Sequence, residues 1–299
     1  MSDIGFIGAG KMGAPMVGNL VSAGHTVTVF DVSSHALEEA KKRGGRIAKD
    51  LTDVASSKEV VITMLPAGPE VKAIYLGPKG ITSIVDSATL LIDCSTIDVQ
   101  SSEVIHSSAR SAGIDMVDAP VSGGVSGAEA GGLTFMVGGT EAAYNNAFPI
   151  LSDMGKAIIH AGKEGRGQAA KICNNMLLGI SMIAVSEAFA LADALGLSRQ
   201  TLFDISSKAT GRCWALNDYC PVPGPVPNSP ANRNYEPGFT ASMMLKDLAL
   251  SQLAADAFRV KTELGSGAEA LYSKFCKAGN GELDFSAIFT TVGKEGEVK

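Results

Sequence analysis

The sequence predicts an α/β fold in which a doubly wound sheet domain over residues 1–163 is followed by an all-helical domain over residues 164–299. Two observations lead to this prediction. Short apolar runs alternate with helical patterns up to residue 163, which is typical of a sheet covered by helices on both faces. Beyond Gly162 the hydrophobic period becomes helical, and no further convincing strand is found.

The first 31 residues combine a strand, a glycine-rich turn, a helix and a second strand that ends in a carboxylate. Strands are predicted at residues 4–7 and 26–30, the helix at residues 14–23, and the turn at Gly8, Ala9, Gly10, Lys11, Met12 and Gly13. This is the Rossmann-type dinucleotide-binding arrangement, in which glycines permit a tight turn and the helix N-terminus faces the pyrophosphate. Asp31 follows Gly10 by 21 residues, where a carboxylate can accept from both ribose hydroxyls and repel a 2′-phosphate. The sequence therefore predicts NAD, in preference to NADP, as the cofactor.

The alternation of strand and helix continues through the first half of the chain. Further strands are predicted at residues 60–65, 89–93, 114–119, 133–137 and 157–160, and further helices at residues 35–43, 69–76, 100–112 and 141–154. Their continuous apolar runs favour a parallel sheet that is buried on both faces. Ligands of such sheets bind beyond the carboxyl ends of the strands. Cofactor and substrate contacts are therefore expected at those ends, which carry Leu65, Pro66, Ser95, Thr96, Ser122, Gly123 and Gly124.

The second half is predicted to be helical. Helices are expected at residues 168–195, 198–208, 240–258 and 267–278, with a short last one at 285–292, and residues 221–238 form an irregular loop that holds six of the twelve prolines. The first helix is apolar on most faces, so it should be buried on most faces. Three glycines in six residues, Gly162, Gly165 and Gly167, predict a flexible approach to it. Lys171 and Asn175 are four residues apart and share one face of this helix. Spacing alone leaves two interpretations of Lys171 open: its side chain faces a polar cleft, or it extends to solvent.

Composition narrows the class of protein. The chain is 45% hydrophobic and 19% charged with a formal net charge of −6, which argues against nucleic acid or an acidic membrane surface as a partner. Its five cysteines contain no Cys-x-x-Cys pair, which favours reduced, mostly buried thiols of a cytosolic protein. The four histidines lack ligand spacing, so no metal site is expected. A strand pattern begins at once and the long helix carries charged and amide residues, so we expect neither a targeting peptide nor a membrane span and predict a cytoplasmic protein.

Four ordered motifs carry a resemblance to a known family. They are Gly5 to Gly13, Asp118 to Gly124, Gly162 to Asn175 and Lys246 to Leu250. With these motifs the chain resembles the β-hydroxyacid dehydrogenases over nearly its full length. The resemblance implies oxidation of a β-hydroxy acid to its semialdehyde by hydride transfer to a nicotinamide cofactor.

A narrower resemblance points to one branch of that family. It rests on Ser95 to Asp98, Lys171 to Leu178, Gly211 to Trp214 and Pro221 to Gly224. These segments are similar to members that oxidise 3-hydroxyisobutyrate to methylmalonate semialdehyde with NAD in valine breakdown. The family also implies a homodimer or homotetramer formed through the helical domain.

The resemblance assigns roles to individual residues. Lys171 is implied to be the catalytic acid/base, because hydride leaves the alcohol carbon only as the hydroxyl proton is withdrawn. The other implied substrate contacts are Asn175 for orientation, Ser122, Gly123 and Gly124 for the carboxylate, Thr96 near nicotinamide and substrate, and Trp214 and Phe239 for the apolar side of the pocket. Lys246 is implied to lie where cofactor and substrate meet. Plain core packing remains an equal interpretation of Trp214 and Phe239.

Other interpretations remain open at this stage. One alternative function is that of a related enzyme of the same family, either a reductase of tartronate, glyoxylate or succinic semialdehyde or an L-serine dehydrogenase. A rival of another class is a non-catalytic binding module of the same fold, against which Lys171, Asn175 and Ser122 argue. Asp118, at a predicted strand end, is best interpreted as a turn-capping carboxylate. Cys173 is expected to be a packed thiol on another face of the helix from Lys171.

Overall fold

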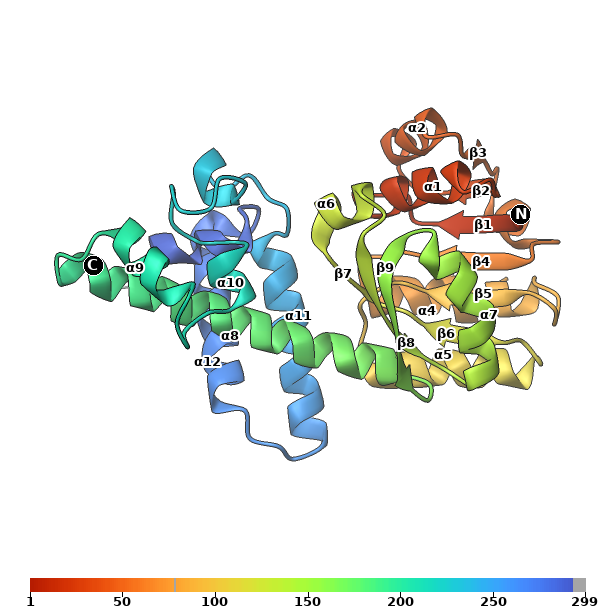
Figure 1. Ribbon diagram of the computed structural model, residues 1–299. Coiled ribbons are helices and arrows are strands. Elements are labelled where there is room, and N and C mark those ends of the chain that lie inside the picture. Colours follow the sequence, from red (N-terminus) through yellow and green to blue (C-terminus); the bar gives the residue numbers. More distant parts are fainter. Residues whose placement is uncertain (78, 293–299) are drawn as a thin grey trace. The chain divides into compact units, whose positions relative to one another are not determined.

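The structure is a computed structural model that describes residues 1–77 and 79–292. The chain forms two compact units, Met1–Lys171 and Ile172–Lys299, and helix α8 (Arg166–Ala194) runs from the first into the second (Figure 1). The first unit contains the sheet and the second is helical. The predicted fold class, an α/β sheet domain followed by an all-helical domain, is confirmed.

The first unit alternates strands and helices along the chain. Its strands are β1 (Asp3–Ile7), β2 (Thr26–Phe30), β3 (Arg46–Ile47), β4 (Val60–Thr63), β5 (Leu90–Asp93), β6 (Met116–Asp118), β7 (Val121–Ser122), β8 (Leu133–Gly138) and β9 (Gly155–Gly162). Its helices before α8 are α1 (Gly13–Ser22), α2 (Ser34–Lys42), α3 (Leu51–Ala55), α4 (Gly68–Leu76), α5 (Val99–Ser111), α6 (Gly124–Glu129) and α7 (Glu141–Ser152), with a 3-10 turn η1 (Ile81–Ser83).

One mixed sheet contains all nine strands of the described residues, in the order β3-β2-β1-β4-β5-β6-β8-β7, with β9 beside β8. Strands β1 to β6 run parallel, but β8 is antiparallel to both β6 and β7. The prediction of a parallel sheet is therefore wrong for this end. The reason is β7, a two-residue strand that follows β6 after Ala119 and Pro120 and is too short to show a period of its own.

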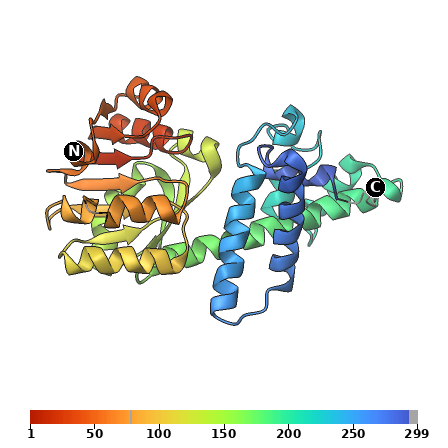
Figure 2. The same cartoon turned by 180° about the vertical axis from the view of Figure 1, so that it is seen from behind.

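The sheet separates two cores, one on each face. On one face Met16 and Leu20 of α1 pack with Ala147 of α7 against inward-pointing strand residues such as Ile62. On the other face, Val54 of α3, Tyr75 of α4 and Ile105 of α5 are buried against the strand residues that alternate with those of the first core. Successive side chains of one strand therefore enter different cores, which explains why these strands are apolar at every position. Figure 2 turns the face with α4 and α5 toward the viewer.

Polar side chains cap most of the longer helices. A side-chain oxygen accepts a backbone N–H at the start of helices α2, α3, α5, α7, α9 and α11, from Ser33, Asp50, Asp98, Thr140, Ser198 and Thr240. Each such cap contributes about 1 kcal/mol. Helix α1 differs, because its N-cap Met12 provides no side-chain acceptor.

The second unit consists of helices around its own core. Besides α8 it contains α9 (Arg199–Ser206), α10 (Trp214–Asn217), α11 (Ala241–Ala257), α12 (Glu263–Phe275), 3-10 turns η2 (Pro230–Arg233) and η4 (Phe285–Thr290), and a π turn η3 (Cys276–Asn280). Helices α11 and α12 lie side by side in Figures 1 and 2. Phe189 of α8, Met244 of α11 and Tyr272 of α12 are fully buried between them. Residues predicted as an irregular loop, 221–238, contain η2 and otherwise no helix or strand.

Helix α8 is less buried than its composition predicts. Leu177 and Leu191 of α8 and Leu195 just after its end are each more than 60% exposed, so the prediction of burial on most faces is wrong. Composition counts apolar residues but does not say which faces neighbouring elements cover. Among the described residues α8 is also the helix that is long and apolar enough to cross a membrane, a test that the core helix of a soluble protein passes as well.

Candidate cofactor and active site

The turn after β1 has the shape that a dinucleotide requires. Gly8 has a φ of +95°, and a Cβ added there would lie 2.3 Å from the carbonyl oxygen of Met64. At Gly13 an added Cβ would lie 2.0 Å from the carbonyl oxygen of Gly8. At Gly10, in contrast, an added Cβ would have no atom of the chain within 4 Å. The first and third glycines are therefore needed for packing, whereas the second leaves open space beside the backbone.

The start of α1 faces the same space without a side-chain cap. Its first N–H groups lack partners within the helix, as at every helix start. Because Met12 supplies no acceptor, an anion can take that place, and the partial positive charge of the helix end favours one. The open side of Gly10 and the uncapped helix start together fit the pyrophosphate of NAD.

Asp31 joins the end of β2 to this turn. Its Oδ2 accepts the backbone N–H of Ala9 at 2.7 Å and its Oδ1 accepts that of Ser33 at 2.8 Å. Each carboxylate oxygen has a second lone-pair direction. The carboxylate is thus held in place and keeps acceptor capacity for the two ribose hydroxyls.

The loops after β4 and β5 are tied to one another. The backbone N–H of Leu65 donates to Oγ of the buried Ser95 at 2.9 Å. Pro66 and Thr96 are the next residues of the two loops; Pro66 is exposed and Thr96 is half-buried. Strands β1, β4 and β5 are neighbours in the sheet, so the glycine turn, Leu65 and Thr96 follow adjacent strand ends.

Lys171 lies in the second turn of α8 and is only 7% exposed. The start of this helix is fixed by Asp118, at the end of β6. Oδ1 of Asp118 accepts the N–H of Gly165 at 2.8 Å, and Oδ2 accepts that of Gln168 at 2.9 Å. Asp118 therefore caps a helix that begins 48 residues later in the chain, which agrees with its interpretation as a capping carboxylate.

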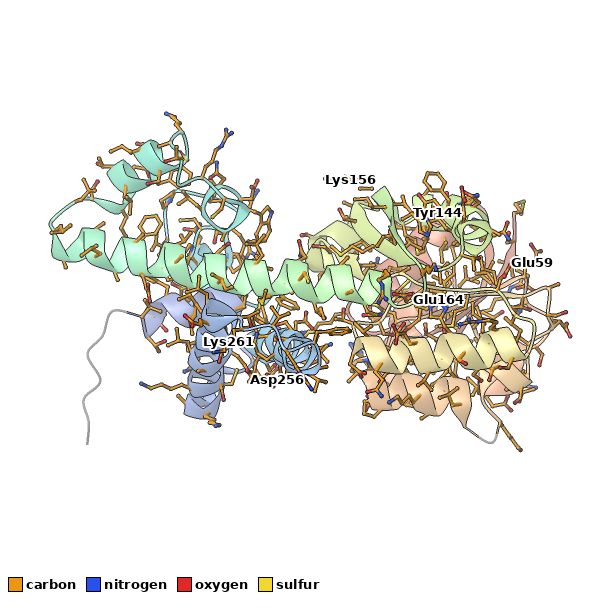
Figure 3. The ribbon with its side chains drawn as sticks, turned by 90° about the horizontal axis from the view of Figure 1, so that it is seen from below. Glu59, Tyr144, Lys156, Glu164, Asp256 and Lys261 are labelled. Carbon is orange, nitrogen blue, oxygen red and sulfur yellow. The ribbon has the colours of Figure 1, made fainter. Side chains whose placement is uncertain are left out.

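His106 completes the contacts of that carboxylate. Its Nε2 lies 2.9 Å from Oδ1 of Asp118, and both side chains are at most 3% exposed. Two surface ion pairs add to the same helix start, Arg110 with Glu164 and Arg166 with Glu103, each at 3.4 Å. Figure 3 labels Glu164 at this end of α8. Exposed pairs of this kind contribute little, so Asp118 is the main anchor.

The carboxylate-binding candidates lie where β7 meets α6. Ser122 ends β7 opposite Thr134 of β8, and its side chain is half-buried. Gly123 and Gly124 follow with φ values of +137° and +64°. Side chains rarely adopt such angles, so glycines are required here. Consecutive N–H groups in a turn of this kind can bind an anion.

In the second unit, Asn175 is held by an acidic residue that the sequence interpretation did not select. The side-chain amide of Asn175 donates to Oδ2 of Asp247, and the two residues are 1% and 2% exposed. Nζ of Lys246 lies 3.4 Å from Oδ1 of the same carboxylate. Asp247 belongs to the Lys246 to Leu250 motif, and this motif was the sequence signal from which it could have been selected. One carboxylate thus contacts both predicted site residues.

Trp214 and Phe239 belong to one aromatic cluster. Tyr219 stacks on Trp214 at 4.8 Å and on Phe285 at 5.4 Å, and Phe239 meets Phe285 edge-on at 5.7 Å between centroids. Oδ2 of buried Asp284 accepts the hydroxyl of Tyr219 and the N–H groups of Gly238 and Phe239. Burial raises the pKa of Tyr219, so the phenol remains a donor. Trp214 is 49% exposed and Phe239 partly so, and both present ring surface beyond the core.

Other predictions about reactive groups have mixed outcomes. Cys173 is exposed, so its interpretation as a packed thiol is wrong, whereas Cys94 and Cys220 are buried. Within the described residues no group of three or more His, Cys, Asp or Glu side chains is arranged to hold a metal ion.

The predicted site residues form two groups, one in each unit. The first unit contains Gly8, Ala9, Gly10, Lys11, Met12, Gly13, Asp31, Leu65, Pro66, Thr96, Ser122, Gly123, Gly124 and Lys171, and the second contains Asn175, Trp214, Phe239 and Lys246. Sequence reasoning missed Gln168, His106, Asp247 and Asp284 as supporting residues, and their partners lie up to 73 residues away along the chain.

Two family models together match almost the whole chain. Residues 3–162 match the NAD binding domain of 6-phosphogluconate dehydrogenase, and residues 165–292 match the NAD-binding domain of NADP-dependent 3-hydroxyisobutyrate dehydrogenase. Both descriptions name the binding of a nicotinamide cofactor, in agreement with the glycine turn.

Known proteins resemble the chain over its full length. A probable 3-hydroxyisobutyrate dehydrogenase of Mycobacterium bovis is 48% identical over 98% of each chain, and an NAD-dependent L-serine dehydrogenase of Pseudomonas aeruginosa is 46% identical over 96% of this chain and 97% of its own. The solved 3-hydroxyisobutyrate dehydrogenase of Mycobacterium tuberculosis with L-serine superposes with a TM-score of 0.92 at 48% identity, covering 97% of this chain and 99% of that one. The chain therefore belongs to the β-hydroxyacid dehydrogenases of the 3-hydroxyisobutyrate dehydrogenase type and is an NAD-dependent oxidoreductase.

Proposed function

We propose that this protein oxidises 3-hydroxyisobutyrate to methylmalonate semialdehyde with NAD, with Lys171 as the general acid/base. The observation that carries the proposal is the burial of Lys171 one helical turn before the buried Asn175, on a helix whose start is fixed by Asp118. A buried amine at a fixed position can take the hydroxyl proton of a bound substrate. Full-length relatives named 3-hydroxyisobutyrate dehydrogenase support the substrate. The place of the reaction is then valine degradation.

We assign cofactor binding to the first 163 residues, which form the proposed dinucleotide-binding domain. Gly8 to Gly13 would hold the pyrophosphate, and Asp31 the adenosine ribose. Leu65, Pro66 and Thr96 would contact the nicotinamide half, and Lys246 of the helical domain would be the one proposed cofactor contact outside these residues. When bound, NAD accepts the hydride from the alcohol carbon.

Residues 164–299 are the proposed substrate and oligomerisation domain, with further substrate contacts from the sheet domain. Ser122, Gly123 and Gly124 would bind the carboxylate through hydroxyl and backbone N–H donors. Asn175 would orient the substrate, and its own amide is held by Asp247. The exposed ring faces of Trp214 and Phe239 would contact the substrate methyl group.

L-serine is the second candidate substrate. It differs from 3-hydroxyisobutyrate by an ammonium group in place of the methyl group. A relative at 46% identity is named an L-serine dehydrogenase, and the 48% identical solved structure is that of an enzyme together with L-serine. Initial rates of NADH formation with 3-hydroxyisobutyrate, 3-hydroxypropionate, L-serine, glycerate and 4-hydroxybutyrate separate the candidates. A higher kcat/KM for L-serine than for 3-hydroxyisobutyrate would make the protein a serine dehydrogenase.

Lys171→Ala tests the catalytic role. General acid–base catalysis contributes about 10²–10⁴-fold, so kcat should fall by at least about 100-fold while the Kd of NAD changes little. Lys171→Arg should not restore activity, because a guanidinium stays protonated. Lys163→Ala, in the exposed loop before α8, is the matched control and should keep the wild-type kcat. A Lys171→Ala enzyme that retains more than about a tenth of wild-type kcat would falsify the assignment.

We further propose a cytoplasmic homodimer or homotetramer. The exposed Leu177 and Leu191 of α8 and Leu195 just after it support association through the helical unit, since large exposed apolar side chains favour a protein partner. Light scattering coupled to size-exclusion chromatography would give the mass, and a monomer at 30.8 kDa would contradict the proposed homo-oligomer.

A further inference from the structure

Gln168 lies in the first turn of α8, and its side chain is completely buried. Its Nε2 donates to the carbonyl oxygen of Ser95 at 2.7 Å, and its Oε1 accepts the backbone N–H of Ile97 at 3.0 Å. The two contacts lie on either side of Thr96. A single side chain therefore holds the backbone of the β5 loop immediately before and after that residue.

The backbone of Gln168 is fixed as well. Its N–H donates to Oδ2 of Asp118, which is itself buried at the end of β6. Gln168 therefore connects three segments of the first unit, namely the end of β6, the loop after β5, and the first turn of α8. Lys171 follows three residues later, on the adjacent turn of the same helix.

We propose that Gln168 is a positioning residue that sets Thr96 relative to Lys171. This inference rests on the proposed function, in which Thr96 contacts nicotinamide and substrate and Lys171 takes the proton. Hydride and proton leave the same carbinol group, so the groups that orient the carbon and accept the proton must be placed together. Gln168 itself touches neither cofactor nor substrate in this scheme. It acts through the two backbone groups that it binds.

The substitution Gln168→Met isolates these contacts. Methionine has a similar length and fills the same space, but it leaves the oxygen of Ser95 and the N–H of Ile97 without their partner. A misplacement of about 1 Å can cost about 100-fold in rate, so kcat should fall by about 10- to 100-fold. The Kd of NAD should stay within about threefold, because the proposed contacts to its pyrophosphate and adenosine ribose, Gly8 to Gly13 and Asp31, are untouched and only the nicotinamide end lies near Thr96.

Thr89→Val is the matched control. Thr89 precedes β5 at the end of the strand opposite Thr96, and its buried hydroxyl donates to the carbonyl oxygen of Lys58 at 2.7 Å. The variant also loses one buried side-chain-to-backbone bond, but at the start of β5 and not at the end near Thr96. Its kcat should equal that of wild type. A similar fall in kcat for both variants would show a general loss of stability and overturn the positioning role.

Two readouts report on position rather than on folding. Exchange of the Ile97 amide hydrogen should accelerate at least about tenfold in Gln168→Met, because each 1.4 kcal/mol of lost protection is tenfold, and should be unchanged in Thr89→Val. A primary deuterium isotope effect on kcat, measured with substrate deuterated at the oxidised carbon, should increase as hydride transfer becomes slower than product release. Unchanged Ile97 exchange with a wild-type isotope effect overturns the proposal.

A parallel assay of Lys171→Ala distinguishes a failure of the proposed general base from a failure of the positioning role. If Lys171→Ala keeps its activity, the general base is wrong and the positioning role falls with it. If Lys171→Ala is inactive while Gln168→Met turns over at the wild-type rate, the positioning role alone is wrong. Where Gln168→Met does not fold, Gln168→Glu keeps the shape and the acceptor for the N–H of Ile97, and its ionised carboxylate has no donor for the carbonyl of Ser95. The same fall in kcat is then expected at pH values where that carboxylate is ionised, with recovery where it is protonated.

Discussion

Removing the carboxylate of Asp118 should destabilise the sheet unit more than an ordinary core substitution does. Asp118 is fully buried and accepts hydrogen bonds from the N–H groups of Gly165 and Gln168 and from Nε2 of His106, all between 2.8 and 2.9 Å. In Asp118→Ala all three donors lose their acceptor in a site that is closed to water.

The magnitude follows from the number of contacts. Hydrogen bonds to charged groups contribute about 1.5–3 kcal/mol each, but they are not additive when they share one acceptor group. Leaving a buried donor without its acceptor costs about 1–3 kcal/mol, and because three donors lose theirs we expect Asp118→Ala to cost about 3–5 kcal/mol. Asp118→Asn keeps one acceptor oxygen and leaves at least one donor unpaired, so it should cost about 1–3 kcal/mol.

Urea unfolding followed by two signals can measure this loss. The single tryptophan, Trp214, lies in the helical unit, so its fluorescence follows that unit, whereas far-UV circular dichroism follows both. Asp118→Ala should shift the circular dichroism transition to lower urea, and two-state analysis applies only if the two signals coincide. Asp115→Ala, an exposed aspartate just before β6, is the control and should stay within about 0.5 kcal/mol of wild type. If Asp118→Ala also stays within about 1 kcal/mol, the capping contacts do not stabilise the helix start as argued.

Further predictions concern the cofactor and pH. Asp31→Asn should reduce the preference for NAD over NADP, which we expect to be about 2–4 kcal/mol in kcat/KM because two charge-assisted bonds to the ribose are at stake; equal efficiency of the unmutated protein with both cofactors would contradict this. Gly10→Val should have the melting temperature of wild type but bind NAD at least about tenfold more weakly, because its side chain fills the open space beside the backbone. Gly13→Val should lower the melting temperature, because its Cβ would lie 2.0 Å from a backbone oxygen. Burial raises the pKa of Asp93 from 3.8 to about 6, so between these values the folded state binds the proton and the unfolded state does not. The free energy of unfolding should therefore increase by up to about 3 kcal/mol as pH falls from 6 to 4, because of this group. The increase should be absent in Asp93→Asn. If the free energies of unfolding of the two proteins depend on pH in the same way, Asp93 is not the group responsible.

The cofactor half of the site was predictable because its signal is local. Gly8, Gly10 and Gly13 lie within six residues, and Asp31 directly follows the next strand. Spacing and strand order alone therefore place them at one edge of the sheet. The distinction among the three glycines was not predictable, because it depends on Met64, which approaches Gly8 from another strand.

The residues that hold the start of α8 could not be found in this way. Gln168 contacts backbone atoms 71 and 73 residues away, and His106 reaches Asp118 from a neighbouring helix. Glutamine and histidine in a helix carry no spacing that predicts such partners. Only burial and partner atoms distinguish Gln168 from an exposed glutamine such as Gln200, which bonds Asp204 on its own helix.

The glycines at the start of α8 can be interpreted in two ways, as a flexible segment or as a site of close packing. Three glycines in six residues indicated a flexible approach, but Gly165 and Gly167 are buried in the structure. A Cβ at Gly167 would lie 2.3 Å from the carbonyl oxygen of Met136 and 2.6 Å from that of Asp118. The helix start can therefore approach β6 and β8 only where no side chain intervenes, and only at this distance does Asp118 accept the N–H groups of Gly165 and Gln168. The glycines thus serve close packing: they allow the capping contact that fixes the first turn of α8, and with it the position of Lys171.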